Sequence, residues 1–149
     1  MSDFIKIAII GAGNMGSAHL KSIEEIANLK LVAICDKDPE KKSLADEYDV
    51  PFFEDHHSLL AAKCCDAVVI ATPHFDHTII GIDALGANVH VLVEKPLGVH
   101  KADCQRLIAA YKNKDKVFAA MFNQRTDPHF KKAKQLVQEE IPAEWNACA

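Results

Sequence analysis

A glycine-rich turn near the start of the chain has the spacing of a phosphate-binding loop. Gly11, Gly13 and Gly16 form G-x-G-x-x-G between an apolar run of strand length and an amphipathic stretch. The first glycine permits a tight turn, the second lets a phosphate approach the backbone, and the third lets the helix pack on the strand. Free amides at the helix N-terminus attract the phosphates. The predicted pyrophosphate site is therefore Gly11-Ala12-Gly13-Asn14-Met15-Gly16.

An acidic residue lies at the distance from the glycine turn that is typical of dinucleotide-binding units. Asp36 ends the second apolar run, twenty positions after Gly16. Its carboxylate can accept hydrogen bonds from both hydroxyls of an adenosine ribose and would repel a 2′-phosphate, which predicts NAD rather than NADP. Lys37 would soften that preference. The alternative is that the three glycines only form a turn and that Asp36 is a surface residue without a ligand. That alternative requires the strand, the helix and the spacing to coincide by chance.

Two further stretches end the fourth and fifth apolar runs. Thr72, Pro73 and His77 follow one run, and Glu94 and Lys95 follow the other. Ligands bind outside the carboxyl ends of strands in open α/β sheets, so both stretches are predicted to line the same crevice as the glycine turn. Position alone leaves His77 equally open to being a helix-start histidine without a ligand. For Glu94 and Lys95, position alone favours an ordinary solvated strand end.

The elements that would hold these residues alternate between strands and helices. The apolar runs are short, nearly continuous and rich in β-branched residues, which is typical of strands covered on both faces. The helical stretches repeat apolar residues at i, i+3, i+4 and i+7. This alternation predicts an α/β fold with a doubly wound parallel sheet of the Rossmann type. The expected strands are Ile5–Ile10, Leu31–Cys35, Pro51–Phe53, Ala67–Ala71, Val89–Val93 and Val117–Met121. The expected helices are Asn14–Ala27, Pro39–Tyr48, Ser58–Ala62, His77–Leu85, Lys101–Lys112 and Pro128–Glu139.

Composition excludes several classes of protein. Of 149 residues, 49% are hydrophobic, and 17 basic against 21 acidic residues give a net charge of −4. This balance argues against a disordered chain, a nucleic-acid-binding protein and a membrane-surface protein. No apolar run approaches the roughly 20 residues of a membrane span. Five scattered cysteines without a CxxC pair predict free thiols in a cytoplasmic protein. The one HxxH pair, His74 and His77, has no further ligand spacing nearby, so no metal site is expected.

The motifs together resemble the Gfo/Idh/MocA family, the oxidoreductases similar to glucose-fructose oxidoreductase and inositol dehydrogenase. The resemblance rests on GAGNMG, the Asp36 strand end, DAVVIATPHFDH, NVHVLVEKPLG and the later Asn123-Gln124-Arg125, in order from about Ile5 to Glu140. The EKP triplet, which begins with Glu94, is the more specific half of this signature.

The resemblance implies roles for the same residues. The glycine turn would bind the pyrophosphate of NAD, and Thr72, Pro73 and His77 would line the cofactor groove. Glu94 and Lys95 would lie near the nicotinamide ribose, with Lys95 reaching the substrate hydroxyl or the catalytic acid/base. The implied reaction is reversible hydride transfer between the nicotinamide and a carbinol carbon of a sugar, cyclitol or related polyol. Beside the reacting oxygen, a lysine would stabilise developing alkoxide charge.

Family members carry a second α/β domain that supplies the substrate pocket, and the resemblance predicts that this domain is absent or truncated here. The expected division is a dinucleotide-binding domain over residues 1–122 and, over 123–149, a crossover helix and the truncated start of the second domain. We therefore expect cofactor binding with little or no turnover. Apolar surface left uncovered predicts a homo-oligomer through Phe130, Val137 and Trp145.

Two other interpretations remain open from the sequence. The chain could be a stand-alone NAD(H)-binding sensor or regulatory module whose catalytic partner is another polypeptide. It could also be a methyltransferase that uses S-adenosylmethionine, since such enzymes share a glycine-rich first turn and an acid after the second strand. The methyltransferase interpretation fits less well because the third glycine and the EKP segment have no role in it.

Overall fold

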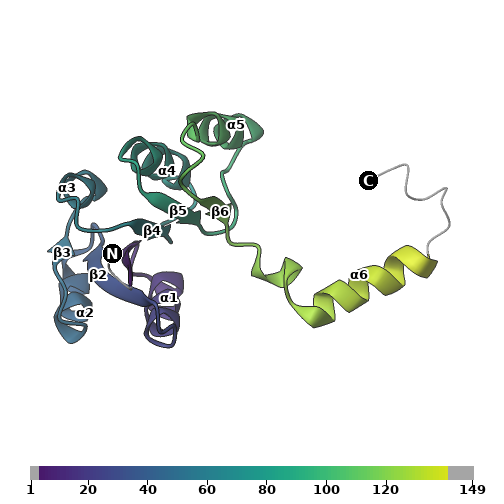
Figure 1. Cartoon of the computed structure of the whole chain (residues 1–149), viewed down its shortest axis with the longest axis horizontal. Helices are drawn as coiled ribbons and strands as arrows, with labels where there is room; N and C mark the ends of the chain where they lie inside the picture. The colour runs from purple at the N-terminus through teal and green to yellow at the C-terminus, as the bar shows by residue number, and fades with distance from the viewer. Residues whose placement is uncertain (1–3, 141–149) are drawn as a thin grey trace.

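The computed structural model describes residues 4–140 and shows one six-stranded sheet with helices on both faces (Figure 1). All strands are parallel, and their order is β3-β2-β1-β4-β5-β6. The order reverses between β1 and β4, which is the switch point of a doubly wound fold. The strands are β1 (Ile5–Ile10), β2 (Leu29–Cys35), β3 (Phe52–Phe53), β4 (Ala67–Ile70), β5 (His90–Val93) and β6 (Phe118–Ala120). The predicted α/β parallel sheet is confirmed.

Helices alternate with these strands along the chain. The α-helices are α1 (Asn14–Glu24), α2 (Lys42–Glu47), α3 (His56–Ala61), α4 (His77–Gly86), α5 (Lys101–Ala110) and α6 (Pro128–Glu140). Two short 3-10 turns, η1 (Pro39–Lys41) and η2 (Asn123–Arg125), precede α2 and α6. None of the helices within residues 4–140 has the length and apolar character that crossing a bilayer requires.

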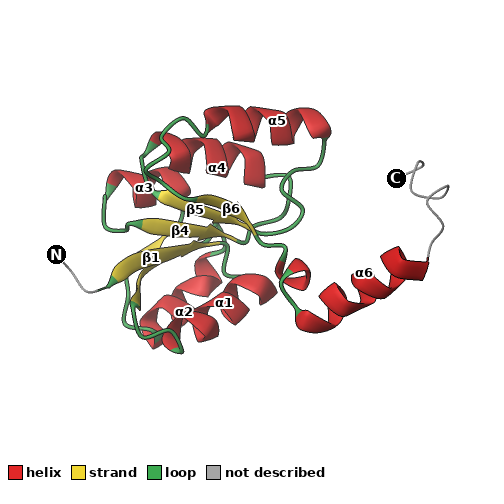
Figure 2. Cartoon of the chain, turned by 45° about the vertical axis from the view of Figure 1, so that its right-hand side comes forward, coloured by secondary structure: helices red, strands yellow, loops and turns green. Residues whose placement is uncertain are grey.

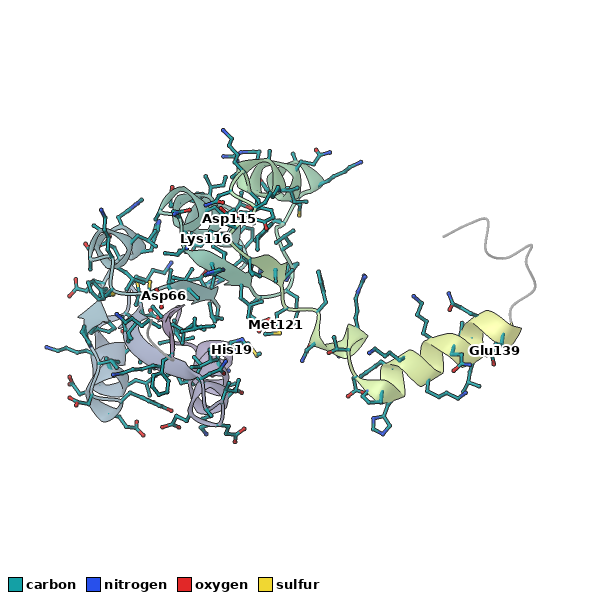
Figure 3. The ribbon with its side chains drawn as sticks, viewed as in Figure 1. His19, Asp66, Asp115, Lys116, Met121 and Glu139 are labelled. Atoms are coloured by element: carbon teal, nitrogen blue, oxygen red, sulfur yellow. The ribbon has the colours of Figure 1, made fainter. Side chains whose placement is uncertain are left out.

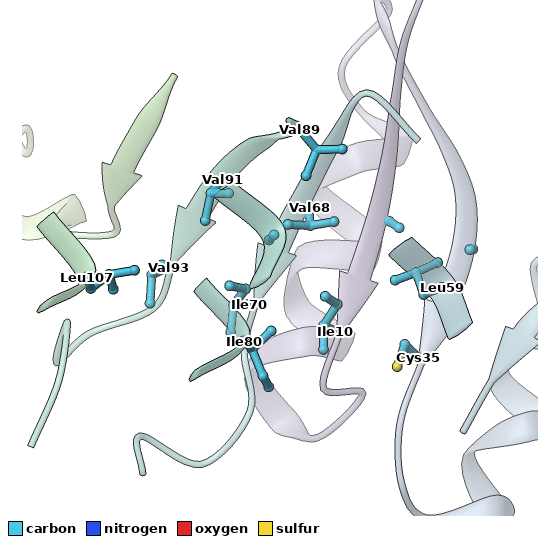
Figure 4. Close-up of a cluster of buried hydrophobic side chains, with 13 residues drawn as sticks. Ile10, Cys35, Leu59, Val68, Ile70, Ile80, Val89, Val91, Val93 and Leu107 are labelled. Atoms are coloured by element: carbon cyan, nitrogen blue, oxygen red, sulfur yellow. The ribbon is translucent and has the colours of Figure 1, made fainter. Parts of the chain in front are cut away.

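The sheet separates two apolar cores. On one face α3, α4 and α5 cover the strands, and on the other face lie α1 and α2 (Figure 2). Ile10 packs in the first core (Figure 4), whereas its neighbour Ile9 packs in the second. Successive strand residues point to opposite faces, so a strand covered on both sides needs apolar residues at every position. This explains why the strands read as continuous apolar runs.

Helix boundaries differ from the predicted ones where local capping decides them. The predicted helix Pro39–Tyr48 divides into η1 and α2, and the Asp38 side chain caps η1 by accepting the Glu40 amide at 3.0 Å. The predicted helix Ser58–Ala62 begins earlier, at His56, because the Asp55 side chain accepts the Ser58 amide at 2.9 Å. A side chain that satisfies a free amide fixes where a helix begins.

The last described helix, α6, extends away from the sheet (Figures 1 and 2). Its apolar residues Phe130 and Val137 are each 53% exposed, so the helix has an apolar face that residues 4–140 do not cover. The third residue of the predicted self-association surface, Trp145, lies outside the described residues, as does Cys148. The other cysteines, which are Cys35, Cys64, Cys65 and Cys104, are free thiols.

Candidate functional site

The glycine turn joins β1 to α1 at the carboxyl edge of the sheet. Gly11 has a φ of +96°, and a Cβ there would lie 2.6 Å from the Thr72 backbone nitrogen. A Cβ at Gly16 would overlap the carbonyl group of Gly11. At Gly13, by contrast, a Cβ would meet nothing within 4 Å. Gly11 and Gly16 are therefore required by the turn itself, whereas Gly13 borders open space at the N-terminus of α1, where an anion can approach the backbone.

The carboxylate of Asp36 lies beside this turn. Its Oδ2 accepts the Ala12 amide at 2.6 Å, and its Oδ1 accepts the Asp38 amide at 2.9 Å. Two backbone donors therefore fix the carboxylate at the end of β2, where it borders the adjoining groove. Lys37 is exposed, and its ammonium group lies 3.5 Å from Asp76 Oδ2 across the mouth of that groove.

A groove of about 520 Å³ runs along the carboxyl edge from β2 to β4. Its walls come from the glycine turn, the β2 end, the start of α3 and the β4 loop with α4. The lining residues include Gly11, Gly13, Asp36, Thr72, Pro73 and Asp76. A second hollow, of about 570 Å³, lies between η2 and α6 and is lined by amide and basic side chains with Phe130. Only the first adjoins the glycine turn.

Two titratable groups in the groove wall have shifted pKa values. Burial, together with the smaller effects of the nearby carboxylates Asp55 and Asp36, raises the pKa of the Cys35 thiol from 9.0 to about 12. The pKa of the Asp55 carboxyl is lowered, first because the Ser58 hydroxyl donates to it and then because the Ser58 amide does. Cys35 therefore presents a neutral thiol to the groove, and Asp55 presents an anion.

Thr72 is the one residue in the described part of the chain whose buried side-chain polar atom has no hydrogen-bond partner. Its Oγ1 lies in the β4 loop that borders the groove, next to the predicted phosphate site. An unpaired buried hydroxyl is costly. A polar ligand in the groove would remove that cost.

His77 is buried beneath the β4 loop and does not belong to the groove lining. Its Nε2 lies 2.9 Å from the Thr72 carbonyl oxygen, and its Nδ1 lies 2.8 Å from that of Pro96. A carbonyl oxygen only accepts hydrogen bonds, so a singly protonated ring satisfies one of these contacts and a doubly protonated ring satisfies both. His77 therefore joins the β4 loop to the β5 loop from below.

Glu94 is 4% exposed, so the prediction from position alone of a solvated strand end is wrong for this residue. Its Oε1 lies 2.7 Å from His19 Nε2 on α1, and its Oε2 accepts the Lys95 amide at 3.0 Å. Burial and two polar contacts hold the carboxylate at the carboxyl end of β5. The next residue, Lys95, is exposed and precedes Pro96 through a cis peptide bond.

Sequence reasoning missed three histidines at this edge. His19 pairs with Glu94, and its position three residues after Gly16 was the only signal available.

His56 lines the groove, and its Nε2 lies 2.9 Å from Asp83 Oδ2 on α4. His56, His57 and Asp83 each offer one possible metal-ligand atom, and these three atoms lie within 4.8 Å of one another. The HxxH pair considered from the sequence, His74 and His77, is not part of this group, and the ring nitrogens of His77 lie beside the carbonyl oxygens of Thr72 and Pro96.

The site residues predicted from the sequence thus form three clusters along one edge. The glycine turn and Asp36 are joined by a hydrogen bond, and Thr72 and Pro73 line the same groove. Glu94 and Lys95 follow β5, on the other side of the switch point between β1 and β4. The exposed residues Asn14 and Met15 begin α1 at the mouth of the glycine turn.

Comparison with known proteins identifies relatives of this arrangement. A family model described as an oxidoreductase family with an NAD-binding Rossmann fold matches residues 5–122. The inositol 2-dehydrogenase of Salmonella typhimurium is 33% identical over 138 residues, which are 89% of this chain and 41% of that protein. The chain therefore spans about two fifths of the length of the curated relatives that it matches.

Solved structures that are similar to this chain are also longer than it. The apo scyllo-inositol dehydrogenase of Lactobacillus casei superposes with a TM-score of 0.81 at 33% identity, over 93% of this chain and 42% of that one. GenD2 from gentamicin A biosynthesis, solved in complex with NAD, superposes with a TM-score of 0.82 at 28% identity, over 91% of this chain and 39% of that one.

Proposed function

Because the chain belongs to the Gfo/Idh/MocA family of oxidoreductases, we propose that it binds NAD as the cofactor half of a dehydrogenase. The substrate class that we propose is a sugar, cyclitol or related polyol, oxidised at a CH–OH group. Relatives named inositol 2-dehydrogenase support this class. The observation that carries the proposal is the bond between Asp36 and the glycine turn beside an open groove.

The residues of this structure fit a dinucleotide. The open space at Gly13 leaves room for phosphate oxygens near the free amides of α1. The hydroxyl of Thr72 is buried without a partner at the same groove and can donate to a phosphate or ribose oxygen. Asp36 is the residue that we propose for the adenosine ribose, and its negative charge supports NAD over NADP.

Lys95 is the residue that we propose for the chemistry. When bound, the nicotinamide ring supplies the acceptor or donor of a hydride. Lys95 is exposed, and its ammonium group has no ion pair or hydrogen bond within residues 4–140. A free cation at this edge can hold the hydroxyl oxygen of a substrate and stabilise the charge that grows there as its proton leaves.

We propose further that this polypeptide binds the cofactor with little turnover on its own. Glu94 is buried and its two oxygens contact His19 and the Lys95 amide, so we infer that it does not serve Lys95 as a proton acceptor. Water has free access to the exposed lysine, which weakens electrostatic stabilisation of a transition state. The same contacts of Glu94 and exposure of Lys95 support the interpretation as a stand-alone NAD(H) sensor. Such a sensor must bind the cofactor in the groove but need not catalyse hydride transfer.

Two measurements test these proposals together. Titration with NADH, followed by its fluorescence, is expected to show saturable binding, and incubation with NAD and myo-inositol is expected to show little reduction. Oxidation at ordinary dehydrogenase rates would contradict the proposed low turnover and exclude the sensor interpretation. Absence of NADH binding, or tighter binding of S-adenosylmethionine, would contradict the proposed function.

A cytoplasmic location stays a prediction that cell fractionation can check.

A further inference from the structure

We propose that His19 is a positioning residue, which orients Glu94 and the loop of Lys95 toward the nicotinamide half of the cofactor. This inference rests on the proposed function. Its starting point is the pair formed by His19 and Glu94, whose side chains are 15% and 6% exposed and whose closest atoms are 2.7 Å apart. Figure 3 shows His19 projecting from α1 toward the edge of the sheet where the chain passes Met121.

Both oxygens of Glu94 have a fixed partner. Oε1 contacts His19 Nε2, and Oε2 accepts the backbone amide of Lys95. An ionised carboxylate only accepts hydrogen bonds, so Nε2 carries the proton in this contact. Without the imidazole, the carboxylate would keep a single directional contact and a buried oxygen without a partner. The histidine therefore determines the direction of the carboxylate, and with it the conformation at the start of the Lys95 loop.

The position of the pair in the fold connects it to the second half of a dinucleotide. Asp36 follows β2 and the glycine turn follows β1, so the adenosine and phosphates belong on that side of the switch point. Glu94 follows β5, on the other side of the switch point. His19 lies on α1, whose N-terminus faces the phosphates. The pair thus joins the phosphate-binding helix to the strand end that faces the rest of the cofactor.

A positioning role and a purely structural role of His19 predict different effects on the affinities for NADH and ADP. ADP contains the adenosine and both phosphates of NADH but lacks the second ribose and the nicotinamide. Loss of the pair should therefore weaken NADH and leave ADP unchanged. General loosening of α1 would weaken both, since both bind at its N-terminus.

The decisive comparison is His19→Asn against His19→Gln. Both variants carry the same amide group, but the longer glutamine can place its nitrogen near the position of Nε2, and the asparagine cannot. We expect His19→Asn to bind NADH about tenfold more weakly, which is the size of one lost polar contact. We expect His19→Gln to stay within about twofold of the wild type and both variants to bind ADP like the wild type. The matched control is His90→Asn, at the opposite end of β5, where the ring Nδ1 accepts the Val117 amide. It should leave both affinities unchanged.

Each other result has a definite meaning. Equal NADH affinities for the two amide variants would overturn the inference while leaving the proposed function in place. Equal losses for NADH and ADP, or loss of ADP binding in both variants, would show a purely structural role and also overturn it. A wild-type protein that binds neither nucleotide would overturn the proposed function itself, and the inference with it.

Discussion

Asp36 and Ala12 are joined by a hydrogen bond of 2.6 Å between the side-chain Oδ2 and the backbone amide. The bond joins the end of β2 to the glycine turn after β1, two segments that are 24 residues apart in sequence. Because Asp38 donates to the other oxygen, the carboxylate is held in place before any ligand arrives. A ribose that binds there meets an acceptor whose orientation needs no further ordering, which favours affinity.

Replacement of Asp36 by alanine should weaken NADH binding more than NADPH binding. The substitution removes acceptors for the ribose hydroxyls and also removes the charge that repels a 2′-phosphate. We expect NADH affinity to fall about tenfold or more and the preference for NADH over NADPH to shrink or invert. Fluorescence titrations with both nucleotides measure this. Lys95→Ala is the control and should change neither affinity by much. An equal loss for both nucleotides after Asp36→Ala would show that the residue supports the turn only.

Two glycines of the turn should respond differently to alanine. Gly13→Ala adds a methyl group in open space, so stability should change by less than about 0.5 kcal/mol while NADH affinity falls at least tenfold. Gly11→Ala forces a side chain onto a φ of +96° and against the Thr72 backbone, and should cost about 2 kcal/mol or more. Urea unfolding and NADH titration separate the two effects. Full NADH affinity in Gly13→Ala would place the phosphates elsewhere.

His77 should matter for stability through the two loops that it joins. His77→Leu removes the buried ring that contacts the part-buried carbonyl oxygens of Thr72 and Pro96. A singly protonated ring donates to one of these oxygens, and one unsatisfied group costs about 1–3 kcal/mol, so we expect the free energy of unfolding to fall by about 1–3 kcal/mol. Urea denaturation followed by circular dichroism gives the value. His74→Leu, at an exposed position in the same loop, is the control. A loss below about 0.5 kcal/mol in His77→Leu would contradict the bridging role.

The Cys35 thiol should resist alkylation in the folded protein. Its pKa of about 12 leaves almost no thiolate at pH 8, and the thiolate is the nucleophile. Mass spectrometry after iodoacetamide treatment should find Cys35 unmodified, whereas the urea-unfolded protein should react there. Rapid alkylation of Cys35 in native protein would contradict this.

The same shift predicts an alkaline loss of stability. Because the folded state keeps the proton that the unfolded state releases near pH 9.0, the stabilisation from Cys35 is complete below pH 9.0 and is lost as the pH rises toward 12. Cys35→Ala should therefore make the free energy of unfolding depend less steeply on pH above 9. An unchanged slope between the two proteins would show that this thiol does not titrate on unfolding.

The apolar face of α6 leads us to propose self-association of this chain. Phe130 and Val137 are half exposed, and exposed apolar surface of this kind favours contact between copies. Light scattering should show a dimer or larger assembly, and Phe130→Glu should shift it toward the monomer. The control is Lys131→Glu, next to it on the same exposed helix. A monodisperse wild-type monomer would refute the prediction.

The sequence by itself was enough to predict the architecture and to place the glycine turn and Asp36 at the same edge of the sheet. Continuous apolar strands require covering on both faces, and G-x-G-x-x-G followed by an acid twenty residues later has few uses other than a dinucleotide. These signals are local, because glycine geometry and strand composition act within a few residues. Helix boundaries were less predictable where a single side chain, such as Asp55, caps a free amide.

Only the tertiary structure decided which residues of the site touch one another. Glu94 reads as a solvated strand end until α1 brings His19 to 2.7 Å from it, 75 residues away in sequence. His77 reads equally well as a groove residue, but packing places it under the loop, between two carbonyl oxygens. Contacts between distant segments depend on how helices pack across the sheet, and no local pattern encodes that packing. Hence the type of ligand could be predicted from residue spacing, whereas the partners of each polar side chain could not.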